Sequence, residues 1–375
     1  MYRPRDIRGI AATLVLLSLA CVARADDLDL GAEPAPSAVA WSGDFLLRQD
    51  IERSWSGGDN ESRLLARLRY GLNWQIDPQW VFGAALRIDE SSIGNEHLVD
   101  YNDNQRPRDL ALDTFYLQYS PAEGQALEAG KDVFPLKLSR MLWDPDLRPA
   151  GLSYSMKRQL SDDTSLRFVA GAFLGQHLSG DQSRISAAQL GLRFREQDMV
   201  QPEFILSYLR FTHLSPLLDA GEDRGNPFEG DLIMKPNGGF LPDFNFFDQF
   251  ELADLQFVLH VGTPTPFRLL LDMDKNLGAV RGNDRAGRIE MALGDSFTAG
   301  GSEVGLAAER MQHSAVQGAF NDDDWWFHAG SHGSMLWYAY GWSDRVRLRL
   351  AWFHEQPDTS RFHWDRWLLD LGWQL

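Results

Sequence analysis

Apolar and polar residues alternate with a period of two along most of the chain. Between Leu64 and Ile76, the even-numbered positions carry apolar and aromatic side chains, while the odd-numbered positions include Arg67 and Arg69. A strand places alternate side chains on opposite faces, whereas helical spacing would scatter the two arginines around the cylinder. The stretch therefore predicts a strand with one apolar and one polar face.

The same alternation recurs further along the chain, with apolar residues at every second position. It is clear in the runs 82–88, 166–174, 255–261, 267–273, 346–352 and 366–375, and weakest over 285–308. Each clear run is about as long as a tilted strand needs to cross a bilayer, roughly 9 to 11 residues. The pattern indicates strands of a membrane-spanning sheet.

Short and long connections alternate between these strands. The tight turns cover 77–79, 161–163, 262–266 and 343–344, and the longer polar segments cover 55–62, 89–108, 133–148, 176–184, 212–249, 275–285, 312–330 and 355–361. A soluble sandwich has no reason to keep every second connection short, but a transmembrane barrel has short periplasmic turns and long outer loops. We predict an all-β fold, a transmembrane antiparallel up-and-down β-barrel of about 16 strands, with an even number favoured.

The final strand ends at the last residue. It places Trp367, Leu369, Leu371, Trp373 and Leu375 on one face. This pattern resembles the terminal strand that the outer-membrane barrel assembly machinery reads. Barrels of this kind usually end in Phe, and Leu375 departs from that pattern.

The N-terminus has the features of an export signal. Arg3, Arg5 and Arg8 precede an apolar stretch over 10–20, and residues 23–25 have the small-x-small form of a leader peptidase site. We expect a cleaved signal peptide over 1–25, a flexible N-terminal segment over 26–37 and the barrel over 38–375. A lipoprotein anchor at Cys21 is the less favoured alternative, because Ser18 stands where a lipobox usually has Leu.

Composition and charge exclude several classes of protein. The formal net charge is -17, and it falls to about -20 without the leader, which argues against a nucleic-acid partner. The mean hydropathy is -0.32, which argues against a bundle of membrane helices. Cys21 is the single cysteine, so an exported chain that has lost its leader has no disulfide or thiolate chemistry.

The chain resembles the putative porin family of Gram-negative bacteria over most of its mature length. The likeness rests on Ser42-Gly43-Asp44 and on the segments 63–71, 112–113, 116–119, 127–131, 143–147 and 149–152. It implies a monomeric or homotrimeric porin of the outer membrane, a water-filled channel for passive diffusion of small hydrophilic solutes, with anions a candidate class. It supplies no catalytic residue, metal or cofactor. An alginate-export-like barrel is a close competitor, because those proteins share arginine-rich inner strands, so a substrate-specific or polysaccharide-export barrel stays open.

The expected partners follow from that resemblance and from the terminal strand. They are outer-membrane lipid and lipopolysaccharide, the barrel assembly machinery and small hydrophilic solutes, with no nucleic acid among them.

The interior of such a barrel is too wide for side chains to fill, so we expect it to hold water. The predicted pore-lining residues are Arg67, Arg69, Arg87, Arg167, Arg193, Arg268, Asp272, Asp274, Glu290, Arg345, Arg347 and Arg349. Two interpretations stay open. The arginines pair with inner-face acids and stiffen the wall, or they guide anions, and both can hold at once.

Three loops carry candidate chemistry. The connection over 133–148 is predicted to fold inward as a constriction loop through Lys137, Arg140, Asp144, Asp146 and Arg148, with a position on the rim as the alternative. Loop 212–249 contains Phe240, Phe244, Phe246 and Phe247, and we expect it to pack into the barrel mouth or against a neighbour, with an aromatic solute track less favoured. Asp322-Asp323-Asp324 before Trp325-Trp326 predicts a solvated acidic tip, favoured over a divalent-cation site shared with lipopolysaccharide.

A phospholipase-like barrel enzyme is the alternative from another class. His332-Gly333-Ser334 and His313-Ser314 place serine and histidine close together. Adjacent strand residues point to opposite faces, no third catalytic group is identifiable, and neither motif matches a nucleophile elbow. We therefore expect no enzyme activity.

Overall fold

The computed structural model describes residues 38–54, 61–92, 110–175, 183–195, 199–214, 228–234, 240–246, 248–280, 282–358 and 361–375. The predicted signal peptide over 1–25 and the segment over 26–37 lie outside the described residues. Both stay predictions.

The described chain forms strands joined by turns and loops. The first nine strands are β1 (Val39–Ser54), β2 (Glu61–Gln75), β3 (Trp80–Ser92), β4 (Ala111–Tyr119), β5 (Gln125–Lys131), β6 (Ala150–Ser161), β7 (Thr164–Leu174), β8 (Arg184–Phe194) and β9 (Val200–Thr212). The others are β10 (Phe228–Met234), β11 (Phe240–Phe246), β12 (Phe250–Val261), β13 (Phe267–Asn276), β14 (Arg285–Gly294), β15 (Ser302–Met311), β16 (Ser331–Ser343), β17 (Val346–Pro357) and β18 (Trp364–Gln374). In this part of the chain, no helix is long and apolar enough to cross a membrane.

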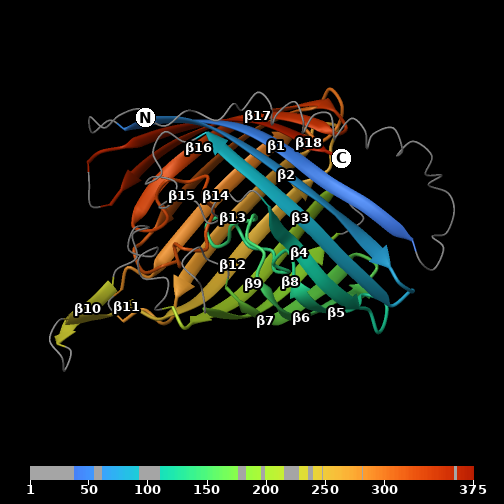
Figure 1. Ribbon diagram of the computed structural model, residues 1–375. Helices are drawn as coiled ribbons and strands as arrows, with labels where there is room; N and C mark the ends of the chain where they lie inside the picture. Colours follow the sequence, from blue (N-terminus) through green and yellow to red (C-terminus); the bar gives the residue numbers. More distant parts are fainter. Residues whose placement is uncertain are drawn as a thin grey trace.

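The strands close into one antiparallel barrel (Figure 1). β1 pairs with β18 from Asp44↔Gln374 to Ser54↔Trp364, and β9 pairs directly with β12. β10 and β11 form a separate two-stranded sheet, and the other 16 strands make the barrel. The predicted 16-stranded all-β barrel is therefore confirmed. Closure leaves the barrel without an edge strand, so its backbone groups are satisfied from strand to strand.

The predicted alternation of short and long connections is also confirmed. Turns such as 76–79, 162–163 and 344–345 lie at the end of the barrel where β1 begins and β18 ends. The long connections lie at the opposite end, including 132–149 between β5 and β6 and 312–330 between β15 and β16. The region over 285–308, where the sequence pattern is weakest, is the β14–β15 hairpin.

The 212–249 connection differs from our expectation. Residues 240–246 lie in β11, which pairs with β10 in a hairpin that extends away from the barrel wall (Figure 1). This hairpin therefore does not pack into the barrel mouth, and the alternative expectation, packing against a neighbour, stays a prediction. Phe247 lies outside the described residues.

The faces of the strands follow the predicted parity. On β17, Leu348 and Leu350 point outward and are 36% and 43% exposed, whereas Ala351 on the inner side is fully buried. Trp41 and Tyr70 stack on the outer wall, as expected for an aromatic band at a membrane interface.

The largest apolar cluster lies inside the barrel. It joins inner-face residues of β7, β8, β9 and β12 to apolar residues from two of the long loops, among them Trp143 from 132–149 and Phe320 from 312–330. Two loops therefore occupy part of the lumen.

Candidate functional site

The loop over 132–149 crosses the lumen and is fixed on one side to the wall of β7, β8 and β12. The carbonyl oxygen of Pro135 accepts a hydrogen bond from Arg167. The carbonyl oxygen of Lys137 accepts hydrogen bonds from Gln189 at 2.8 Å and from Gln256 at 3.2 Å. These partners are inner-face side chains, so this part of the loop lies against the inside of the barrel.

The other side of the same loop reaches β2. Asp146 accepts hydrogen bonds from Arg67 and from Arg69, the latter at 3.0 Å. Burial alone would raise the pKa of Asp146, but the guanidinium groups of Arg67 and Arg69 outweigh that effect and hold it well below its usual range. The loop thus spans from the β2 wall to the β8–β12 wall and narrows the lumen.

The remaining candidate residues of this loop have different surroundings. Lys137 donates to Glu203 at 2.6 Å, and Arg148 donates to the carbonyl oxygen of Pro145. The Asp144 side chain is 1% exposed and accepts a hydrogen bond from the backbone N–H of Asp146. Burial, followed by the nearby carboxylates, raises the pKa of Asp144 well above its usual range.

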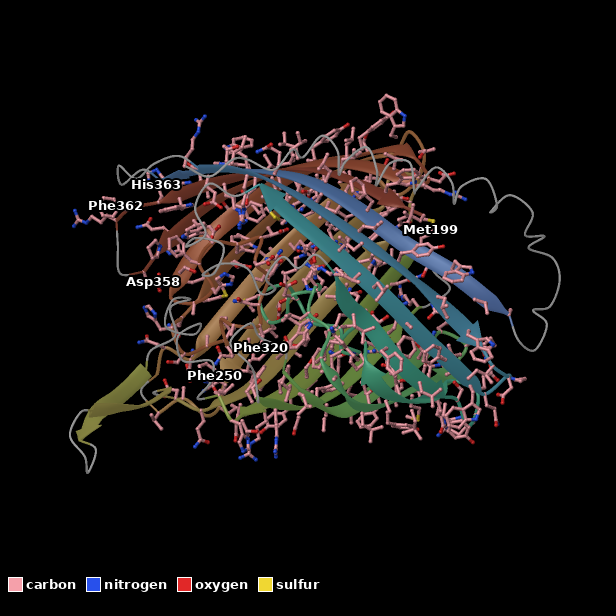
Figure 2. The ribbon with its side chains drawn as sticks, viewed as in Figure 1. Met199, Phe250, Phe320, Asp358, Phe362 and His363 are labelled. Carbon is pink, nitrogen blue, oxygen red and sulfur yellow. The ribbon has the colours of Figure 1, made fainter. Side chains whose placement is uncertain are left out.

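The loop over 312–330 is a second inward-folded loop, and the sequence pattern gave no sign of it. Ala315, Ala319 and Phe320 are fully buried, and the Phe320 ring stacks on Trp143 with 5.7 Å between ring centroids. Figure 2 shows Phe320 within the outline of the barrel. Two backbone hydrogen bonds join the two loops, from Asp144 to the carbonyl oxygen of Phe320 and from Asp322 to the carbonyl oxygen of Arg140.

The predicted solvated acidic tip at 322–324 is therefore wrong. Asp322 and Asp324 are 4% and 3% exposed, and both accept hydrogen bonds from Arg140. The acidic run looks like an exposed tip in the sequence because its cationic partners are far away along the chain. Carboxylate oxygens of Asp144, Asp322 and Asp323 lie within 4.8 Å of one another, an arrangement that could accept a metal ion.

Most of the predicted pore-lining arginines are paired with carboxylates. The pairs are Arg67 with Asp44 and Asp146, Arg69 with Asp113 and Asp146, Arg87 with Asp89, Arg193 with Glu203, Arg268 with Glu290, Arg347 with Glu303, and Arg349 with Asp324 and Asp370. Arg167 instead donates to Gln189 and Pro135. Two of these nine acids, Asp146 and Asp324, belong to loops, so their pairing could not be predicted from the strands alone.

Asp272, Asp274 and Arg345 were predicted to line the pore but do not border open space inside the barrel. Asp272 and Asp274 are inner-face residues of β13 but are only 2% and 4% exposed. Arg345 lies in the exposed turn between β16 and β17. The strand parity was right for both aspartates, but parity does not show which inner positions a loop covers.

A cavity of about 1020 Å³ lies inside the barrel beside loop 132–149. The residues around it include six arginines and four carboxylates, a net charge of +2: Arg48, Arg67, Arg140, Arg268, Arg347, Arg349, Glu290, Asp295, Glu303 and Asp370. Arg48, Arg140, Glu303 and Asp370 were not among our predicted pore-lining residues. The parity of β1, β15 and β18 identifies three of them as inner-face positions.

Apolar side chains cover another part of the cavity wall. They include Leu138, Leu270, Met335 and Trp337. The Trp337 ring lies across Gly305 of β15, where a Cβ would come within 1.9 Å of the ring, and its Nε1 donates to Glu303 at 2.8 Å. The cavity lining therefore mixes charged and apolar side chains, since Trp337 binds Glu303 and Met335 contacts Arg349.

The serine and histidine candidates for an enzyme lie apart from this cavity. His332 and Ser334 are two residues apart on β16 and share its outer face, so the argument from opposite faces does not apply to them. Ser334 is the register neighbour of His354, whose Nδ1 lies 3.0 Å from Asp365. Among the described residues, no hydrogen bond joins Ser334 to either histidine.

Comparison with known proteins supports the channel interpretation. Residues 54–220 match the model of a family described as "Putative porin", which confirms the resemblance seen in the sequence. No sequence among the curated proteins matches the chain.

Solved outer-membrane proteins share the fold. OprB of Pseudomonas putida is 11% identical with a TM-score of 0.58, and the similarity covers 90% of this chain and 94% of that chain. OmpF of Salmonella typhi, solved in complex with daunomycin, is 10% identical with a TM-score of 0.56, covering 91% of this chain and 98% of that chain. A loop-deletion mutant of OmpT from Vibrio cholerae is 8% identical with a TM-score of 0.51, covering 91% and 100%.

Proposed function

We propose that this barrel, whose residues 54–220 match the putative porin family, is an outer-membrane porin that lets small hydrophilic solutes diffuse passively through a water-filled lumen. The closed 16-stranded wall and the charged cavity of about 1020 Å³ carry this proposal. An apolar outer face and a charged inner face are what a water-filled pore in a bilayer requires.

The two inward-folded loops set the narrowest part of the path in this proposal. Loop 132–149 meets loop 312–330 through Arg140 and Asp322, at 2.8 Å between their charged atoms. Because the loops are bound to β2 through Asp146 and to β1 and β17 through Asp324, a solute passes beside these contacts, along the wall of β13, β14, β15 and β16 that lines the cavity. The cavity that borders this wall is wide enough for small solutes and too small for a folded protein segment.

We further propose that the channel prefers anions. The whole chain is acidic, but the cavity lining has a net charge of +2. Charges at a constriction act at short range, whereas those on loop tips in water are screened over roughly 8 Å at physiological ionic strength. The lining should therefore decide selectivity more than the net charge does.

Swelling of proteoliposomes tests both the diffusion channel and its preference for anions. Small sugars should enter vesicles that contain the refolded protein, at a rate that falls steeply with solute size. A small monovalent anion should enter faster than a cation of similar size. If none of these solutes enters, the barrel is not a diffusion channel. Faster entry of the cation would overturn the anion preference and leave the channel intact.

Export and assembly complete the proposal. We expect cleavage after Ala25, so that the mature chain begins at Asp26, followed by delivery to the barrel assembly machinery through the terminal strand. Lipopolysaccharide contacts and a homotrimer are the proposed surroundings of the folded barrel. N-terminal sequencing of outer-membrane material tests the cleavage site, and light scattering in detergent tests the trimer.

A further inference from the structure

Four arginines from four separate elements converge on the acidic tip of loop 312–330. Arg48 of β1 and Arg349 of β17 bind the Asp324 carboxylate at 2.5 and 3.4 Å. Arg140 of loop 132–149 binds the same carboxylate at 3.2 Å. Arg366 of β18 donates to the carbonyl oxygens of Asp323 and Asp324 at 2.7 and 2.9 Å.

These contacts neutralise a site that would otherwise be strongly basic. We call Arg48, Arg140 and Arg349 the arginine cradle. Of the carboxylates bound to it in the described part of the chain, only Asp370 belongs to the wall, and it pairs with Arg48 and Arg349. Without the loop, these three guanidinium groups and Asp370 would leave a net charge of +2, which Asp322 and Asp324 cancel. The loop tip is therefore the counter-ion of the cradle.

Other contacts already anchor the loop on both sides of the tip. Phe320 packs between Trp143 and Phe211. Beyond the tip, the backbone N–H groups of Trp326 and Phe327 donate to Glu355 at 2.9 to 3.0 Å. The packing of Phe320 and the hydrogen bonds to Glu355 already hold the loop in place. The three guanidinium groups that bind Asp324 are therefore not required to anchor it.

The cradle also borders open space. Arg48, Arg140, Arg349 and Asp370 all line the cavity of about 1020 Å³. The Arg140 side chain is 42% exposed while that of Asp324 is 5% exposed. An anion in the cavity can therefore approach the cradle from the side opposite to the loop tip.

We propose that the arginine cradle is a binding site for small solutes with two or more carboxylate or phosphate groups, and that Asp322 and Asp324 occupy it as a built-in competitor. Guanidinium groups bind carboxylate and phosphate oxygens with the same fork geometry, so either anion can take the place of the aspartates. A solute needs two anionic groups because it replaces two carboxylates. This proposal rests on the channel function for the entry of the solute, but not for its binding.

Binding of citrate to Asp324→Asn in detergent micelles tests the site directly. The variant opens the cradle, so calorimetry should show citrate binding at least about tenfold tighter than in the wild type, since hydrogen bonds to charged groups contribute most in such sites. Pyrophosphate should behave like citrate if the site accepts both anions, and acetate should bind weakly to both proteins. Adding Arg48→Gln to Asp324→Asn should abolish the gain.

Glu303→Gln is the matched control. It also removes one carboxylate that faces the cavity, where Glu303 pairs with Arg347, outside the cradle. Citrate affinity should then change less than about twofold. An equal gain in both variants would mean a general charge effect and would overturn the site, as would an unchanged affinity in Asp324→Asn.

Two further measurements distinguish failure of the binding site from misfolding of the variant and from failure of the proposed channel. If Asp324→Asn fails to fold, as judged by heat-dependent gel migration, Asp322→Asn should show a smaller gain in the same direction, and no gain there would overturn the site. Citrate should also block bilayer currents of Asp324→Asn at lower concentration than those of the wild type. Absence of current in every protein would defeat the proposed channel, while calorimetry would still decide the cradle.

Discussion

Alternation along each strand decides whether a wall residue points outward or into the lumen, and this alternation could be read from the sequence. Alternation put Leu350 outward and Arg347 inward, and the structure agrees, with Leu350 43% exposed and Arg347 bound to Glu303 at 3.1 Å. The partners of the inner residues could not be predicted in this way. Arg48 and Asp324 are separated by 276 positions, and no local pattern connects such residues.

Substitution of Leu350 by Arg tests the outer face. If Leu350 faces lipid near the midplane, Leu350→Arg should lower the free energy of unfolding by about 2 to 4 kcal/mol, because a charged group is placed in hydrocarbon. Arg347→Ala should cost less than about 1 kcal/mol, because Arg347 is partly exposed to lumen water. Urea titration of the protein folded into vesicles measures both. Equal losses at the two positions would show that the faces are misassigned.

At the scale of elements, the sequence predicted the strands and their connections but only one of the two inward-folded loops. The mixed charges of 133–148 suggested a constriction. The acidic run at 322–324 instead suggested an exposed tip, since carboxylates without visible partners belong in water. In the structure Arg140 and Arg48 supply those partners. The described hairpin within 212–249 likewise does not fill the barrel mouth, because β10 and β11 extend away from the wall.

Removal of loop 312–330 tests its place in the lumen. Replacement of residues 315–329 by a short Gly-Ser linker should raise single-channel conductance, because the segment fills space inside the barrel. Deletion of the β10–β11 hairpin, residues 228–246, is the matched control and should leave conductance unchanged, since that hairpin extends away from the wall. If both deletions change conductance alike, loop 312–330 is not the narrowing element.

Docking of this loop should depend on pH through Asp322. Burial raises the pKa of Asp322 to about 6, although Arg140 acts in the opposite direction. Because the docked state binds the proton more tightly, docking should strengthen as the pH falls from about 6 towards 3.8, the ordinary pKa of this carboxyl, and should stay constant above about 6. Asp144, whose pKa is also raised by burial, acts in the same direction.

Asp324 does not contribute to the pH dependence of docking near pH 6. Burial would raise its pKa, but Arg48, Arg140 and Arg349 outweigh burial and hold it below its usual range, so Asp324 stays ionised. Hydrogen exchange of residues 315–324, corrected for intrinsic rates, should show more protection at pH 5 than at pH 7. Asp322→Asn should reduce that difference. More protection at pH 7 in the wild type would contradict the assignment.

For the whole molecule, the central claim is a channel whose selectivity is set inside the barrel and not by the net charge of -17. Closure of the wall and the match over residues 54–220 support the channel. The sign of the lining charge supports the selectivity. Arg67 belongs to that lining, and Arg69 binds the same Asp146 at the crossing of loop 132–149.

The most direct test is the reversal potential of the channel in a salt gradient across a planar bilayer. The wild type should show discrete conductance steps and a reversal potential on the anion side of zero. Replacement of Arg67 and Arg69 together by Gln should move that potential towards cations, because Asp146 then loses both guanidinium partners. A wild-type channel that already prefers cations, or a reversal potential unchanged by the double substitution, would contradict selectivity by lumen arginines, and absence of conductance would contradict the channel itself.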